Sequence, residues 1–137
     1  MAIRLVSEPR RGYAEIGVKQ SGTVTLGYPV VNSSGYAAAG APTVDDFIGI
    51  ATETVTEPGT SDGSVSVEVA LYSPDDLYEI DDAATNITVA DRYALFAISA
   101  TGTITAISAS TTAGTYCFFL QDVVSTSKAR GTIRLNA

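Results

Sequence analysis

The sequence predicts a mainly β protein, folded as a small barrel, a tulip-like sheet or a sandwich, with very little helix. One basis is alternation, because Val65, Val67 and Val69 are separated by polar residues, which is typical of a strand with one buried face. Another is the composition of turns, since residues 32–35 and 58–63 combine glycine with asparagine, proline or aspartate. Short strands joined by tight turns are therefore expected throughout.

An ordered repetition of pattern supports the same fold class. The repeated segments are residues 23–30 with 86–95, residues 47–55 with 116–124, and the glycine-led strands 63–67 with 131–135. Such a repetition predicts two related halves, covering about residues 22–71 and 86–137. In this alignment Ile50 corresponds to Phe119, and both side chains should be buried.

Residues 1–20 have no counterpart in the second half and are expected to form an N-terminal arm. The rest of the 137-residue chain, residues 21–137, is long enough for a single β domain. Arms of this kind often become ordered only against a partner. The arm residues expected to contact that partner are apolar or cationic: Ile3, Arg4, Leu5, Val6, Arg10 and Arg11.

One helix candidate covers residues 73–84, between the two halves. Ser73 suits an N-cap, Pro74 suits a first turn, and the carboxylates of Asp75 and Asp76 suit the positive end of a helix dipole. An irregular connection between the halves would accommodate the same residues, so both interpretations stay open.

Residue types that carry catalysis are scarce. The chain has no histidine, which removes the commonest general base, the usual triads and the usual zinc ligands. Its one cysteine, Cys117, cannot form an internal disulfide, and its apolar neighbours predict a small buried core side chain. We therefore expect no enzymatic activity, no cofactor and no metal.

The acidic residues between positions 75 and 82 are the main exception to consider. These residues are Asp75, Asp76, Glu79, Asp81 and Asp82. They supply enough oxygens for calcium, but they lack the spacing and glycine of an EF-hand loop. Helix capping beside a solvated loop is the preferred interpretation, with a calcium site as the alternative. A glycosidase pair is disfavoured, because such sites usually add aromatic platforms and tryptophan is absent.

Charge is segregated along the chain, whose net charge is −7. Residues 47–91 carry ten carboxylates and no lysine or arginine, whereas cations gather near the two ends. This pattern suggests that the ends meet an acidic partner while the middle faces water, and it disfavours nucleic acid as a partner. No apolar run approaches the roughly 20 residues of a membrane span, and the first residues lack the apolar core of a signal peptide. Neither a membrane nor export is therefore expected.

Three segments in the first half resemble one family. Residues 22–30 read Gly-Thr-Val-Thr-Leu-Gly-Tyr-Pro-Val, residues 45–51 read Asp-Asp-Phe-Ile-Gly-Ile-Ala, and residues 63–69 read Gly-Ser-Val-Ser-Val-Glu-Val. In this order they resemble the head decoration, or capsid-cementing, proteins of tailed bacteriophages. The resemblance covers about residues 22–71 and, more weakly, residues 86–136. It implies trimers or clusters on the capsid exterior that lock neighbouring subunits together.

The resulting functional hypothesis is a non-enzymatic structural protein that binds the outside of a phage capsid and bridges its subunits. The expected partner is the lattice of the major capsid protein, and the expected state is a homo-oligomer, with a trimer favoured. The protein would be made in the host cytoplasm and would end on the virion exterior. Two alternatives remain: another virion component, such as a head fibre base, a tail protein or a minor capsid protein, and a carbohydrate-binding or adhesion module.

Overall fold

The structure is a computed structural model that describes residues 3–5, 12–42, 46–84, 86–107 and 116–135. The predicted mainly β fold is confirmed, since the described residues form thirteen strands and a single 3-10 turn. The elements are β1 (Ile3–Leu5), β2 (Tyr13–Gly17), β3 (Thr23–Val24), β4 (Pro29–Ser33), β5 (Tyr36–Ala39), β6 (Phe47–Ala51), β7 (Val55–Thr56), β8 (Ser66–Leu71), β9 (Tyr78–Ile80), η1 (Val89–Asp91), β10 (Leu95–Ile98), β11 (Ile104–Ile107), β12 (Tyr116–Ser125) and β13 (Lys128–Ile133).

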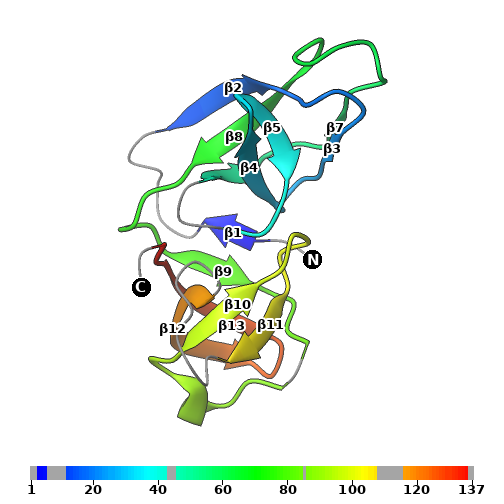
Figure 1. Cartoon of the computed structure of the whole chain (residues 1–137). Helices are drawn as coiled ribbons and strands as arrows, with labels where there is room; N and C mark the ends of the chain where they lie inside the picture. The colour runs from blue at the N-terminus through cyan, green and yellow to red at the C-terminus, as the bar shows by residue number, and fades with distance from the viewer. Residues whose placement is uncertain (1–2, 6–11, 43–45, 85, 108–115, 136–137) are drawn as a thin grey trace.

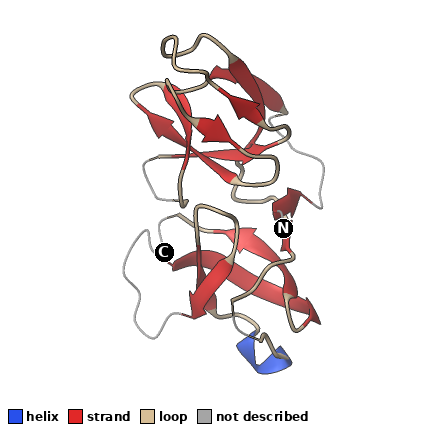
Figure 2. Ribbon diagram, turned by 90° about the vertical axis from the view of Figure 1, so that its right-hand side faces the viewer, coloured by secondary structure: helices blue, strands red, loops and turns tan. Residues whose placement is uncertain are grey.

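The strands form two units with the same strand order, drawn one above the other in Figures 1 and 2. The first unit is the sheet β2-β8-β6-β4-β5, and the second contains β9-β13-β12-β10-β11, all antiparallel. In both units a parallel bridge then joins the two edges, between Val18 and Ala37 in the first and between Ala83 and Ile104 in the second. Each sheet therefore curls into a small barrel.

The expected N-terminal arm is wrong for the part of it that the structure describes. β2 is an edge strand of the first barrel, where it pairs along its length with β8. β1 pairs with β9 and adds a sixth strand to the second barrel's sheet. The first barrel therefore begins at Tyr13 and the second at Tyr78, each one strand earlier than the halves expected from the sequence.

Of the two interpretations of residues 73–84, the helix is wrong. Residues 74 and 75 form a turn, and β9 follows between β1 and β13. The side chains of Tyr78, Glu79 and Ile80 are all buried, and a strand in the middle of a sheet can bury both of its faces. The serine, proline and aspartates thus belong to the turn that leads into a strand, for which the same residue types are favourable.

Comparison of the strand pairing in the two barrels shows that the sequence alignment of the two halves is wrong by one residue. Ile50 lies opposite Ala70, and Leu120 lies opposite Gly131. The first residues of β2 and β9 lie opposite Ala70 and Gly131 too, so Ile50 corresponds to Leu120. The predicted burial of Ile50 is confirmed, but that of Phe119 is wrong: its side chain is only half buried, because it points to the other face of β12 from the buried Leu120.

Each barrel has an apolar core, and the second core reaches across to the first barrel. The first cluster consists of Val18, Val24, Val30, Ala37, Ala51, Val67 and Val69. The second cluster consists of Ile3, Ile50, Tyr78, Ile80, Ile87, Phe96, Ile98, Ile104, Cys117, Phe118, Leu120, Ala129 and Ile133. Cys117 is fully buried, as predicted, and burial raises the pKa of its thiol to about 11. The thiol therefore stays protonated at neutral pH, in keeping with a core role.

β1 connects the two barrels (Figure 1). While β9 pairs with one edge of β1, the backbone N–H of Ile3 donates to the carbonyl of Gly27 in the first barrel, at 2.8 Å. Tyr72 reinforces the junction, because its hydroxyl donates to the carbonyl of Ile133 at 2.6 Å and its ring packs 5.1 Å from that of Phe47. Residues 3–5 and Tyr72 thus connect the two barrels.

Candidate functional site

An open, mostly apolar groove of about 330 Å³ lies where the two barrels meet. Its lining comes from β1, the start of β2, the turn before β4, and strands β6 and β8: Ile3, Arg4, Tyr13, Leu26, Gly27, Ile50, Ala51, Thr52 and Ala70. Buried core residues such as Ile50 and Ala70 form part of the lining, so the groove rests on the packed interior of the molecule.

Two large apolar side chains of the groove stay exposed. Tyr13 is 56% exposed at the first position of β2, and Leu26 is 55% exposed. The backbone around Leu26 is fixed, because its N–H donates to the hydroxyl of Thr54 at 3.0 Å and the N–H of Gly27 donates to the carbonyl of Ala51 at 2.8 Å. Exposed apolar side chains on a fixed backbone beside a groove are typical of a binding surface.

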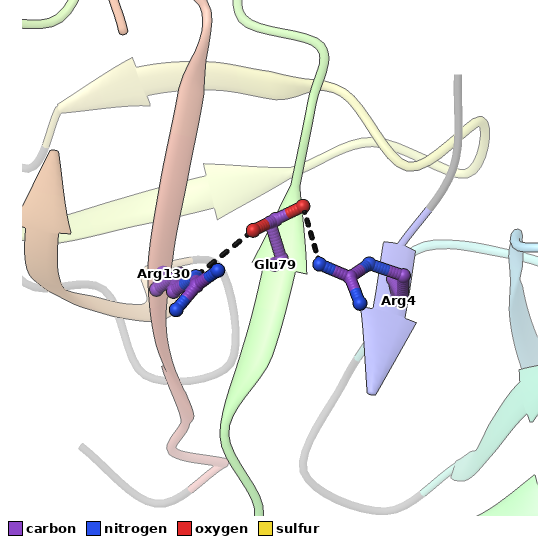
Figure 3. Close-up of polar contacts among 3 residues, drawn as sticks. All are labelled: Arg4, Glu79 and Arg130. Atoms are coloured by element: carbon purple, nitrogen blue, oxygen red, sulfur yellow. Dashed lines mark hydrogen bonds and ion pairs between the residues drawn. The ribbon is translucent and has the colours of Figure 1, made fainter. Parts of the chain in front are cut away.

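A row of three charged residues begins at Arg4, which lines the groove, and continues across the sheet of the second barrel (Figure 3). Arg4, Glu79 and Arg130 lie directly opposite one another on β1, β9 and β13, and each arginine donates to the Glu79 carboxylate at 2.9 Å. The Glu79 side chain is only 8% exposed. Hydrogen bonds from Arg4 and Arg130 hold the pKa of Glu79 below its usual range, against the opposing effect of burial. The row therefore ties β1 to the second barrel.

The structure places three of the residues that were expected from the sequence to contact a partner, all of them in β1. Ile3 is 3% exposed and belongs to the second core, so most of its side chain packs inside the molecule beneath the groove that it lines. Arg4 is exposed and lines the groove, but its guanidinium already pairs with Glu79. The backbone of Leu5 lies in β1, and Val6, Arg10 and Arg11 fall outside the described residues.

The acidic residues near positions 75–82 do not converge on one point. Glu79 faces the two arginines, and Asp82 accepts a hydrogen bond from the Thr103 hydroxyl at 2.8 Å. Within the described part of the chain, no group of three or more histidine, cysteine or acidic side chains is placed to hold a metal ion. The calcium alternative thus has no support in the arrangement of these residues.

A second buried carboxylate, that of Glu57, closes a loop of the first barrel and is not part of the groove lining. Its oxygens accept hydrogen bonds from the backbone N–H groups of Ser21 at 3.0 Å and Gly59 at 2.5 Å, and from the Ser64 hydroxyl. Burial raises the pKa of Glu57, but the hydrogen bonds from Ser64, Ser21, Gly59 and Ser61 outweigh it, so the pKa falls to about 2. The partners come from the loop that follows Glu57 and from Ser21, just before β3, so the contacts fasten this loop to the body of the first barrel.

Sequence reasoning missed both exposed apolar members of the groove. Tyr13 falls in the segment assigned to an arm, and Leu26 lies within the repeated segment 23–30. The sequence does contain a signal at Leu26, because the next residue is Gly27 and glycine marks a turn there. A large apolar side chain next to a turn has little space in the core and stays exposed.

Comparison with known proteins gives no family: no family model matches the chain, and no curated protein matches it significantly. In the described residues, no helix has both the length and the apolar character needed to cross a membrane.

Proposed function

We propose that this protein is a non-enzymatic structural component of a tailed-phage virion, which binds the outside of the capsid and stabilises it by bridging capsid subunits. The observation that carries the proposal is the apolar groove at the barrel junction, with Tyr13 and Leu26 exposed at a surface supported by the core. The partner would be the major capsid protein, through a segment that places apolar side chains in this groove.

The energetics of the groove suit a repetitive lattice. Burying a large apolar side chain contributes about 1.5–3 kcal/mol, and Tyr13 and Leu26 each still expose more than half of theirs. Such a contact is weak by itself. Copies held by symmetry on a capsid would act together, so that avidity would compensate for the modest strength of each contact.

The rigid connection of the barrels favours a bridging role. A protein that clamps two subunits must transmit force between its contact surfaces, and here β1 pairs with β9 while Ile3 bonds to Gly27 across the junction. The start of β2 offers a further contact, because Tyr13 lies at the groove, at the opposite end of β2 from the bridge to β5.

The alternatives use the same surface in other ways. Another virion component, such as a head fibre base, a tail protein or a minor capsid protein, would bind through the groove at a different place on the particle. A carbohydrate-binding module would be favoured by a pair of tyrosines in one groove, whereas the lining of this groove contains one, Tyr13. We therefore prefer the capsid.

Association into a homo-oligomer, with a trimer favoured, is part of the proposal and rests on the resemblance to decoration proteins. Sedimentation velocity at micromolar concentration measures it directly. A trimer in free solution supports the proposal. A protein that remains monomeric both in solution and on particles would contradict this part of it.

The proposal is tested by mixing the purified protein with empty capsids of the phage whose genome carries this sequence, and by measuring the protein that sediments with the particles. We expect saturable binding, and a decrease of at least about tenfold in affinity for the double variant Tyr13→Ser and Leu26→Ser, because the loss of about 1.4 kcal/mol already has that effect. The matched control is Val89→Ser, which removes a 66% exposed apolar side chain of the second barrel away from the groove.

Each outcome of this experiment decides one point. No sedimentation of the wild-type protein with the capsids would refute capsid binding. Binding of the wild type with an unchanged affinity of the double variant would retain the function and exclude the groove as the contact. An equal effect of Val89→Ser would show that the loss reflects general surface hydrophobicity.

A further inference from the structure

Aromatic and cationic side chains gather on the outer face of the second barrel, centred on Phe119. In the register of the sheet, Phe119 of β12 lies between Leu95 of β10 and Thr132 of β13. Tyr93, two residues before Leu95, and Arg134, two residues after Thr132, are the diagonal neighbours of Phe119 on the same face. The Arg134 guanidinium lies 3.7 Å from the centre of the Phe119 ring, and the Tyr93 ring lies 6.2 Å from it.

Tyr93 is held in a backbone conformation that its side chain disfavours. Its φ is +67°, in the left-handed region that suits glycine, and its side chain is 62% exposed. The surrounding structure enforces this conformation, because the N–H of Tyr93 donates to the carbonyl of Leu120 at 2.6 Å. Strain of this kind, at an exposed aromatic residue with no core to fill, is typical of residues kept for binding.

Among the described residues, the two cations of this face lack the carboxylate partner that Arg4, Lys19 and Arg130 have. Arg92 stacks on Tyr93 at 5.1 Å and donates to its hydroxyl at 2.7 Å, much as Arg134 stacks on Phe119. Within the described part of the chain, no carboxylate lies within ion-pair distance of either arginine, whereas Arg4 and Lys19 each have one. Two guanidinium groups without a carboxylate are notable on a protein of net charge −7.

We propose that Arg92, Tyr93, Phe119 and Arg134, which we call the Arg–aromatic face, form a docking site for an acidic protein segment. The rings would receive the apolar parts of the segment, and the guanidinium groups would pair with its carboxylates. Arginine and tyrosine are the residue types most enriched at the energetic centres of protein interfaces. The inference concerns the second barrel alone and holds whether or not the junction groove binds a capsid.

Charge decides between an acidic protein segment and a nucleic acid. Aromatic rings beside arginines also suit unpaired bases, but nucleic acid affinity depends on many cations that neutralise phosphates. Here the face carries two arginines, and the net charge of the whole chain would repel a polyanion. A short peptide with a few carboxylates matches the two cations better.

The test measures binding of a short fluorescein-labelled peptide, in which glutamates alternate with leucine and alanine, to the full chain by fluorescence anisotropy. The matched peptide has glutamine in place of glutamate. We expect binding of the glutamate peptide that weakens with salt, and little binding of the glutamine peptide. The double variant Arg92→Gln and Arg134→Gln should bind about tenfold more weakly. The control variant Lys19→Gln and Lys128→Gln changes the net charge equally and should bind within about twofold of wild type.

The variant Tyr93→Gly separates binding from folding. Glycine adopts φ +67° without strain, so this variant should have a melting temperature at least equal to that of the wild type. Its affinity for the glutamate peptide should nevertheless fall severalfold, because the exposed ring is lost. Equal affinity for the two peptides, an unchanged affinity of the double arginine variant, or tighter binding of a labelled oligothymidine than of the glutamate peptide would each overturn the proposal.

Discussion

Gly131 of β13 lies opposite Leu120 in the pairing of β13 with β12, where the two strands approach too closely for any side chain. A Cβ atom at this position would lie 2.1 Å from the carbonyl oxygen of Phe119, 2.9 Å from its carbonyl carbon and 3.0 Å from Cζ of Phe118. The two shortest contacts are to backbone, so no side-chain rotation can relieve them. The variant Gly131→Ala must therefore push β12 and β13 apart.

The expected cost of Gly131→Ala follows from what that separation breaks. Forcing an extra methyl group into a packed core typically costs about 1–3 kcal/mol. Weakening two ladder hydrogen bonds adds about 0.5–1.5 kcal/mol each. The sum is about 2–6 kcal/mol, a large part of the ~5–15 kcal/mol by which a domain is usually stable.

Urea unfolding followed by circular dichroism measures this cost, with Gly35→Ala as the control. Gly35 has φ +92° but nothing within 4 Å of a built Cβ, so its substitution should cost only the backbone strain of about 1–2 kcal/mol. A loss of stability for Gly131→Ala no larger than that of Gly35→Ala would refute the close approach of β12 and β13.

Three further predictions concern the loop of Glu57, the packing of β1 and the barrel junction. Because the pKa of Glu57 is lowered from 4.5 to about 2, its contribution to stability is complete above pH 4.5 and is lost as the pH falls towards 2; Glu57→Gln should reduce the loss of melting temperature over that range, and an unchanged pH profile would contradict the network. Ile3→Ala should destabilise the protein by about 2–5 kcal/mol in urea unfolding because it leaves a cavity in the second core, whereas a cost below ~1 kcal/mol would mean that β1 is not packed there. Tyr72→Phe should cost about 1 kcal/mol through the lost hydrogen bond to Ile133, measured in the same way, and an unaltered stability would argue against that bond.

The fold class was predictable because short-range patterns determine it. Alternation at Val67 and Val69 places both side chains in the first core, and the apolar run around Cys117 enters the second. The order of the strands recurs in the two barrels because similar runs of strand and turn recur in the sequence. Both the fold class and the strand order therefore depend on patterns among residues that are close in sequence.

The positions that could not be predicted depend on contacts distant in sequence. β1 has only three residues, too few for a periodic signal, and its place is determined by Glu79, which is 75 positions away from Arg4. The misplacement of Phe119 arises because β12 departs from regular pairing on both sides, after Phe96 in β10 and between Leu120 and Asp122. Such a bulge shifts the inward and outward faces by one residue without any mark in the sequence pattern.

Only part of the candidate site could be predicted from the sequence. The sequence directed attention to the N-terminal residues, and Arg4 does border the groove. It could not reveal that Ile3 is buried, because a short apolar run next to arginines is equally compatible with a free arm and with a strand added to a sheet. Tyr13 and Leu26 become members of one surface only through the folding of the first barrel, which brings the start of β2 and the turn before β4 to the same groove.

The most direct test of the proposed function is a cryo-electron microscopy reconstruction of empty phage capsids, of the kind to which the proposal assigns the protein, after incubation with the purified protein. We predict added density on the outer surface that fits the two barrels, follows the capsid symmetry, and places the groove beside Tyr13 and Leu26 against the capsid protein. Absence of added density would contradict capsid binding, and density in which the groove faces solvent would contradict its assignment as the contact surface.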